Sequence, residues 1–340
     1  MQLKISAFGM IDHAAIDLDH LTVIAGHNDT GKSMIGRVLF SITQGMSAIP
    51  FTKVSSPEDM RAVAESINQI MESEFLGPVI QKNLAKDAVI ELKDGASIIL
   101  QMKISQEKGV ELQKLAPWTI CDSTIIEGPL IFEFVPLITS FFDAHGMPRH
   151  GEGMPRIPYH SIDLARKLQA PSVASMKQKE KVYAEVQSII DSFRSTPGYR
   201  SEKQPVGNKN LNVGGVASGV KVLSVINALA REGYIHKDTI LIFDEPETSL
   251  HPEWQIGYAK VICTLADYGI KVLLTTHSPY MLEAIKEFSK NDAATKFYVS
   301  YQDKESGFVT YQDTMGDITP LINALSQPLY DLISTSDDEF

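Results

Sequence analysis

The chain has 340 residues, of which 44% are hydrophobic and 21% are charged. This balance is ordinary for a globular protein and excludes a largely disordered chain. The formal net charge of -11 argues against nucleic-acid binding by the whole surface, although it leaves room for a local basic patch. Two cysteines are too few for a disulfide framework.

The sequence predicts a cytoplasmic protein without a membrane segment. No apolar run reaches the roughly 20 residues that a membrane-spanning helix needs. Residues 1–6 lack the basic region and the long apolar stretch of a secretory signal. The low cysteine content also fits a reducing compartment.

Hydrophobic periodicity predicts strands and helices in the first half of the chain. Strands are expected at 3–8, 15–18, 21–25, 88–92 and 97–104, with an apolar run at 124–134. Helices are expected at 33–42, 57–71, 161–168 and 177–193. The strands at 88–92 and 97–104 predict a hairpin, because a Lys-Asp-Gly turn joins them.

In the second half, helices alternate with buried strands. The expected order is helix 220–230, strand 239–243, helix 252–268, strand 271–275 and helix 280–288. This alternation indicates a mainly parallel sheet flanked by helices. The predicted fold class is therefore α/β, with an additional antiparallel β element in the first half.

A motif between a buried strand and a helix fits the G-x-x-x-x-G-K-[ST] phosphate loop. Its residues are Gly26, His27, Asn28, Asp29, Thr30, Gly31, Lys32 and Ser33, and Met34 follows. In such a loop, backbone N–H groups and the helix N-terminus bind phosphate oxygens. Lys32 would reach the β- and γ-phosphates of ATP, and Ser33 would hold Mg²⁺. The alternative is a chance glycine-rich turn, which the flanking strand and helix disfavour.

Two carboxylates follow the buried strand at 239–243. Asp244 and Glu245 lie at the strand end, where α/β sheets bind ligands. Asp244 would contact the Mg²⁺ shell, and Glu245 would orient and deprotonate water for attack on the γ-phosphate. Two acids after a strand are often only an exposed strand end or a helix cap. Together with the phosphate loop, they favour the catalytic interpretation.

The segment 244–252 resembles the second nucleotide motif and the adjoining turn of ABC-type ATPases. The likeness is to the branch that includes RecF, SMC and the overcoming-lysogenization-defect ATPases, and it covers residues 1–50 and 211–280. The resemblance implies a P-loop NTPase fold in which Glu245 is the hydrolytic base. It also implies that residues 249–251 touch the opposite subunit.

The same resemblance gives roles to two further segments. Ser218 and Gly219 precede a helix and are similar to the signature loop, which in this family closes on the γ-phosphate bound by the other subunit. Common helix-capping chemistry is the alternative for that segment. His277, after the strand at 271–275, corresponds to the histidine that contacts the γ-phosphate and positions water. A satisfied core or capping histidine is the alternative there.

The chain departs from the family pattern at several positions. Asp29 stands where glycine or asparagine is usual, although aspartate tolerates positive φ. Its extra negative charge would weaken triphosphate binding unless it faces away. His251 stands where an aspartate is usual, and the transporter signature Leu-Ser-Gly-Gly-Gln is absent. The glutamine that links the metal to the helical lobe has only Gln44 and Gln101 as candidates.

The expected domain organisation is a discontinuous nucleotide-binding core at 1–136 and 211–335, a helical lobe with loop insertions at 137–210, and an acidic tail at 336–340. The stretch 145–210 contains eleven basic and six acidic residues. This excess indicates either a nucleic-acid or acidic-protein surface, or a solvated helix face, and the solvated face is favoured. The three histidines of this region (His145, His150 and His160) have no zinc-site spacing and are expected at the surface.

The resemblance implies an ATPase that forms a homodimer, or a higher oligomer, around two ATP–Mg²⁺. We expect it to act on an effector nuclease in trans, as a Septu-like or PARIS-like antiphage defence subunit. The alternatives are a DNA-repair ATPase that acts on DNA ends and a slowly hydrolysing, nucleotide-gated scaffold. A transporter ATPase is disfavoured by the signature segment and by His251.

Overall fold

The computed structural model describes residues 1–47, 49, 56–75, 87–128, 137–138, 140, 157–169, 183–184, 186–189, 191, 218–248, 250–289 and 294–336. The helices are α1 (Lys32–Met46), α2 (Pro57–Phe75), α4 (Tyr159–Lys167), α6 (Ser218–Glu232), α7 (Pro252–Asp267), α8 (Pro279–Phe288) and α9 (Thr319–Ser336). The strands are β1 (Gln2–Phe8), β2 (Ile11–Asp17), β3 (Leu21–Ala25), β4 (Ala88–Asp94), β5 (Ser97–Ser105), β6 (Gly109–Leu115), β7 (Asp122–Glu127), β8 (Thr239–Asp244), β9 (Lys271–Thr276), β10 (Thr295–Gln302) and β11 (Val309–Asp313).

The described strands form one 11-stranded mixed sheet in the order β6-β5-β4-β1-β2-β11-β10-β3-β9-β8-β7. At one end, β10, β3, β9, β8 and β7 are parallel. At the other end, β2, β1, β4, β5 and β6 pair antiparallel. β11 joins the two blocks, because it is antiparallel to β10 and parallel to β2. The α/β class is confirmed, and the antiparallel part is larger than expected.

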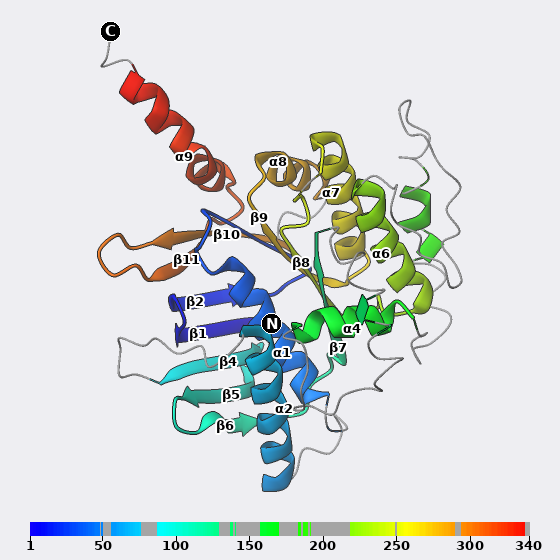
Figure 1. The fold of residues 1–340 in the computed structure, drawn as a ribbon, viewed down its shortest axis with the longest axis vertical. Coiled ribbons are helices and arrows are strands. Elements are labelled where there is room, and N and C mark those ends of the chain that lie inside the picture. The colour runs from blue at the N-terminus through cyan, green and yellow to red at the C-terminus, as the bar shows by residue number, and fades with distance from the viewer. Residues whose placement is uncertain are drawn as a thin grey trace.

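Helices cover both faces of the parallel block, and β3 shows why. Leu21, Val23 and Ala25 pack in a core with residues of α6, α7 and α8, whereas Ile24 packs in a second core with residues of α1 and α2. Successive side chains of a strand point to opposite faces, so a strand that is buried throughout needs cover on both. Figure 1 shows α6, α7 and α8 grouped together, away from α1 and α2.

Side-chain caps begin the helices that follow β8 and β9. The Ser278 side chain accepts a hydrogen bond of 3.3 Å from the Met281 amide, and Pro279 lies in the first turn of α8. Nδ1 of His251 accepts a hydrogen bond of 3.4 Å from the Glu253 amide at the start of α7. Such caps bind N–H groups that a helix leaves unpaired. They therefore fix where the chain turns away from the sheet.

The parallel register brings four strand ends to one edge of the sheet. Ala25 of β3 pairs with Thr276 of β9, and Thr275 pairs with Asp244 of β8. Asp244 in turn pairs with Glu127 of β7. The carboxyl ends of parallel strands are where open α/β sheets bind ligands. The segments that follow these four strands are therefore neighbours in space.

The structure also contains elements that the sequence did not predict, namely β6, β10, β11 and α9. Figure 1 shows α9 projecting from the rest of the described fold. Most of the predicted lobe at 137–210 and of the acidic tail lies outside the described residues, but α4 packs against β7 and α2. Among the residues that the structure describes, none of the helices combines the length and apolarity required to cross a bilayer.

Candidate nucleotide-binding site

The loop between β3 and α1 contains residues with positive φ angles. Gly26 and Asp29 have φ angles of 154° and 59°. A side chain on Gly26 would lie 1.9 Å from Ser300 Oγ, so glycine is required there. Asp29 keeps the shape of the loop, as expected, because aspartate tolerates this region. Asp29 is exposed at the loop tip together with His27 and Asn28.

Thr30 and Lys32 form hydrogen bonds within the loop. The Thr30 hydroxyl donates a hydrogen bond of 2.8 Å to the His27 carbonyl, and Lys32 Nζ donates one of 2.6 Å to the same oxygen. Burial lowers the pKa of Lys32, and the nearby carboxylates of Glu245 and Asp244 oppose this effect. A buried ammonium gains more from an anionic partner than an exposed one does. Lys32 is therefore well placed to receive a phosphate.

The first turn of α1 brings Ser33 to Asp244. Gly31 precedes this helix with a φ of 71°, and the Met34 amide donates a hydrogen bond of 3.0 Å to its carbonyl. Ser33 Oγ donates a hydrogen bond of 2.9 Å to Asp244 Oδ1, and the Thr275 hydroxyl donates to the same oxygen. Burial raises the pKa of Asp244, and these two hydroxyls act in the opposite direction. The two expected metal ligands thus lie in contact.

The chemistry of these donors fits Mg²⁺. The ion prefers oxygen ligands, keeps several waters and needs only one or two protein groups besides phosphate. The Ser33 hydroxyl and the Asp244 carboxylate provide such a pair. Bound there, Mg²⁺ would neutralise charge on the phosphate oxygens.

Glu245 and His277 contact each other across the ends of β8 and β9. The Glu245 carboxylate forms a hydrogen bond with Nε2 of His277. Glu245 has a φ of 47°, a left-handed value that is uncommon for a residue other than glycine. The bond to His277 lowers the pKa of Glu245, and burial opposes this shift. The expected base and the expected γ-phosphate-contacting histidine are therefore adjacent, with the carboxylate ionised at neutral pH.

Sequence reasoning missed Glu247, a buried carboxylate next to His277. Its Oε1 accepts hydrogen bonds of 2.6 Å from the Thr276 hydroxyl and from the His277 amide. Burial raises the pKa of Glu247, although these bonds act against the shift. Glu247 thus fixes the turn that carries His277. A third acid within four residues of Asp244 was the available signal.

A second missed carboxylate, Glu127, ends β7 beside Asp244. Arg37 of α1 lies 3.1 Å from Glu127 Oε1, and Nε2 of His160 lies 3.2 Å from the same oxygen. Nδ1 of His160 lies 2.7 Å from Glu74. Burial opposes the charged form of His160, but the two carboxylates outweigh it and raise the pKa of His160 to about 9. The expectation that His160 lies at the surface is wrong, because α4 inserts it between two acids.

Neither glutamine candidate reaches this site. Gln44 Nε2 donates a hydrogen bond of 2.7 Å to Asp122, which begins β7 at the edge opposite Asp244. Gln101 lies on β5 in the antiparallel block, 3.5 Å from Glu91. Both candidates are therefore wrong. Position in the sequence could not show to which edge of the sheet each side chain belongs.

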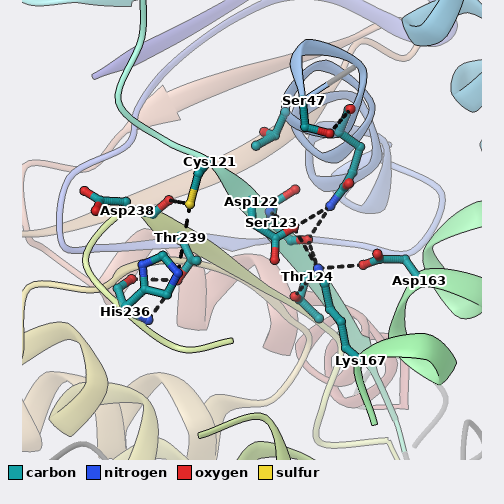
Figure 2. Close-up of polar contacts among 12 residues, drawn as sticks. Ser47, Cys121, Asp122, Ser123, Thr124, Asp163, Lys167, His236, Asp238 and Thr239 are labelled. Carbon is teal, nitrogen blue, oxygen red and sulfur yellow. Dashed lines mark hydrogen bonds and ion pairs between the residues drawn. The ribbon is translucent and has the colours of Figure 1, made fainter. Parts of the chain in front are cut away.

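Lys167, one of the basic residues counted in 145–210, does not contribute to a basic surface. Its Nζ lies 2.8 Å from Asp122 and 2.7 Å from Asp163 (Figure 2). Two further oxygen atoms of β7 accept hydrogen bonds from it. Lys167 is only 5% exposed, so it pairs with Asp163 and Asp122 within the fold and is neither a nucleic-acid contact nor part of a solvated helix face.

The structure describes only some of the residues that are expected to contact a second copy of the chain. Ser218 and Gly219 begin α6, so they lie at a helix N-terminus as expected. Such an end can bind an anion. Ser249 lies outside the described residues, whereas His251 is exposed at the start of α7.

A loop with positive φ angles between a parallel strand and a helix, beside a hydroxyl–carboxylate pair, is the arrangement typical of a P-loop nucleotide-binding site. Residues 161–282 match the model of the AAA_15 family, described as an AAA ATPase domain. This segment contains Asp244, Glu245 and His277. The match confirms the expectation of an ATPase. Among curated proteins, none matches the chain at a significant level.

Solved structures of ATPase heads and cassettes are similar to this chain over most of its length. The SMC head domain from Thermotoga maritima has 13% identity and a TM-score of 0.46, covering 92% of this chain and 98% of that one. An SMC head bound to the C-winged helix domain of ScpA has 15% identity and a TM-score of 0.49, covering 92% and 96%. An ATP-binding cassette of an ABC transporter in its ADP conformation has 12% identity and a TM-score of 0.43, covering 98% and 99%.

Proposed function

We propose that the chain binds ATP–Mg²⁺ at the loop between β3 and α1 and hydrolyses it with Glu245 as the base. The observation that carries this proposal is the hydrogen bond of 2.9 Å between Ser33 and Asp244. It joins the phosphate loop to the acidic strand end, the two motifs from which the sequence predicts a nucleotide site. The family match to an ATPase domain supports the same conclusion.

Binding would begin with the phosphates entering the loop. The N–H groups of residues 26–33 and the N-terminus of α1 attract the negative charge. Lys32 would exchange its bond to the His27 carbonyl for a bond to a phosphate oxygen, since a charged acceptor is the stronger partner. Ser33 and Asp244 would hold Mg²⁺.

Hydrolysis needs a water that is deprotonated as it attacks. The water oxygen would bond to the γ-phosphorus while one of its protons passes to the Glu245 carboxylate. At the same time the bond between the γ-phosphorus and the oxygen that bridges to the β-phosphate would break, and ADP would leave with that oxygen. The lowered pKa of Glu245 keeps this base ionised. His277, held in place by Glu247, would contact the γ-phosphate and fix the direction of the water.

We further propose that a second copy of the chain completes each site. Ser218 and Gly219 of that copy would close on the γ-phosphate, with the N-terminus of its α6 as the anion-binding group. A homodimer would then contain two ATP–Mg²⁺, and higher oligomers could be built from such dimers. ATP would hold the copies together, and hydrolysis would separate them.

ATP binding and hydrolysis would control the activity of another protein. By its resemblance to small ATPases of antiphage defence, we propose an effector nuclease in trans, in the cytoplasm. Lys167 is one of the basic residues of 145–210, and because it is buried it would not itself contact nucleic acid. Copurification from the native operon would identify the partner. A chain that copurifies with no other protein would contradict the proposal of an effector.

Phosphate release from ATP–Mg²⁺ tests the proposed reaction. The wild-type chain should release phosphate, and Glu245→Gln should abolish release while keeping nucleotide binding. The exposed Glu283→Gln on α8 is the matched control and should behave as wild type. Full turnover in Glu245→Gln would exclude Glu245 as the base.

A further inference from the structure

Two residues of the hairpin formed by β10 and β11 hold the phosphate loop from the side of the sheet. Ser300 Oγ donates a hydrogen bond of 2.7 Å to the Thr30 hydroxyl. The Tyr311 hydroxyl donates a hydrogen bond of 2.7 Å to the Thr30 carbonyl. Ser300 and Thr30 are 2% and 1% exposed, so bulk water does not compete for the contact between them.

The sheet register explains why both residues reach the loop. β10 runs parallel to β3 with Val299 beside Ala25, so Ser300 lies level with the point where the loop leaves β3. Ser300 and Tyr311 are partners in the antiparallel ladder of the hairpin, and their side chains therefore share one face. The close approach of Ser300 to Gly26 leaves no room for a side chain at that glycine.

These contacts fix the direction of N–H groups in the loop. In a planar trans peptide the C=O and the following N–H point in opposite directions. A Thr30 carbonyl bound to Tyr311 therefore directs the Gly31 N–H away from the hairpin. The Thr30 hydroxyl also donates to the His27 carbonyl at 2.8 Å, which sets the direction of the Asn28 N–H in the same way.

We propose that Ser300 and Tyr311 are positioning residues that hold the phosphate loop in its anion-binding shape before the nucleotide arrives. Both act through Thr30. Donors that are already aligned bind phosphate more tightly than donors that must be ordered during binding. This inference rests on the proposed function of the loop as an ATP site.

The test is Tyr311→Phe, which removes one hydroxyl and keeps the ring. Tyr298→Phe is the matched control, because the Tyr298 hydroxyl on the same hairpin accepts a hydrogen bond of 2.9 Å from the Asp17 amide and does not touch the loop. Calorimetric titration with AMP-PNP and Mg²⁺ should show Kd rising by about 5- to 30-fold in Tyr311→Phe and in Ser300→Ala, as expected for one lost buried hydrogen bond. Tyr298→Phe should keep the wild-type Kd.

Two further measurements separate positioning from general stability. In nucleotide-free protein, amide hydrogen exchange at residues 26–32 should be faster in Tyr311→Phe than in Tyr298→Phe. In a Thr30→Val background, Ser300→Ala should cause no further loss of affinity, because Ser300 acts through the Thr30 hydroxyl that this background lacks. An equal rise of Kd in both tyrosine variants, or no rise in Tyr311→Phe, would overturn the inference.

The proposed function is tested separately by the same titration. Wild-type chain that does not bind AMP-PNP, or Lys32→Ala that binds it normally, would contradict the ATP site and the inference built on it. Normal binding by wild type, loss in Lys32→Ala and an unchanged Kd in Tyr311→Phe would overturn only the positioning role.

Discussion

The Ser33 hydroxyl and the Asp244 carboxylate are 211 positions apart in the sequence and 2.9 Å apart in the structure. The bond joins the first turn of α1 to the end of β8, and β9 lies between β8 and β3, the strand that leads into the phosphate loop. Thr275 of β9 donates to the same carboxylate oxygen. Three elements (α1, β8 and β9) therefore meet at one carboxylate.

Replacement of Asp29 should tighten nucleotide binding. Asp29 carries a negative charge in the phosphate loop, and its φ of 59° is one that asparagine also adopts. Asp29→Asn should therefore keep the shape of the loop and lower the Kd for ATP by about 2- to 10-fold, the range of one exposed charge interaction. The exposed Asp267→Asn on α7 is the control. The same titration in high salt should reduce the difference, and weaker binding by Asp29→Asn would contradict this account.

Two inactive variants should complement each other if a second copy completes the site. Lys32→Ala removes the phosphate-binding lysine, and Ser218→Arg obstructs the N-terminus of α6. A mixed dimer has one site with both changes and one site with neither, so an equimolar mixture should recover about a quarter of wild-type phosphate release if the sites are independent. Each variant alone should be inactive. Activity of Ser218→Arg alone, or no recovery in the mixture, would contradict a composite site.

Glu247 should matter for turnover although it does not contact the water. Glu247→Ala leaves the Thr276 hydroxyl and the His277 amide without their acceptor, and should cost about 1–3 kcal/mol of stability. Turnover should fall because His277 is no longer held. Glu247→Gln keeps one acceptor oxygen and should preserve most of both properties. Denaturant unfolding and phosphate release measure the two effects, and normal turnover in Glu247→Ala would exclude this role.

The buried His160 should make stability depend on pH in the alkaline range. Its pKa is raised to about 9, so its charge stabilises the fold fully below the ordinary histidine pKa of ~6.5, and this contribution is lost as the pH rises through about 9. Glu127 behaves in the opposite way: burial raises its pKa, but the contacts of His160 and Arg37 outweigh burial and lower it to about 2. Its contribution is therefore present above pH ~4.5 and is lost as the pH falls towards 2.

His160→Gln should remove this alkaline dependence. At pH 7 the variant should be less stable by about 3–5 kcal/mol, because Glu74 stays buried without a positive partner. Denaturant midpoints between pH 6 and 10 would measure both effects. The exposed His13→Gln is the control and should follow the wild-type curve. A wild-type curve that does not fall more steeply than that of His160→Gln would contradict the buried charge.

The motifs of the site were predictable from the sequence because each depends on local chemistry. Loop glycines, a lysine before Ser33 and acids after an apolar strand rarely occur in this order outside a nucleotide-binding protein. The buried strands β8 and β9 were predictable for the same reason, as continuous apolar segments. The structure adds that their carboxyl ends meet at one edge.

What the sequence could not show depends on long-range pairing. Ser300 and Tyr311 are ordinary polar residues until β10 pairs with β3, more than 270 positions away. His160 follows a loop and was expected in solvent, yet α4 buries it between two carboxylates. Gln44 was misplaced because a residue near the end of α1 lies at the opposite edge from its beginning. Each case depends on where an element packs, which periodicity does not report.

The most direct test of the central claim is the position of the metal and the triphosphate. Crystals of the Glu245→Gln chain with ATP and Mn²⁺ would give an anomalous signal for the metal. We predict one manganese ion bound by the Ser33 hydroxyl and the Asp244 carboxylate, with the γ-phosphate between Lys32 and the strand ends. Manganese and triphosphate bound elsewhere, with this edge of the sheet empty, would contradict the account.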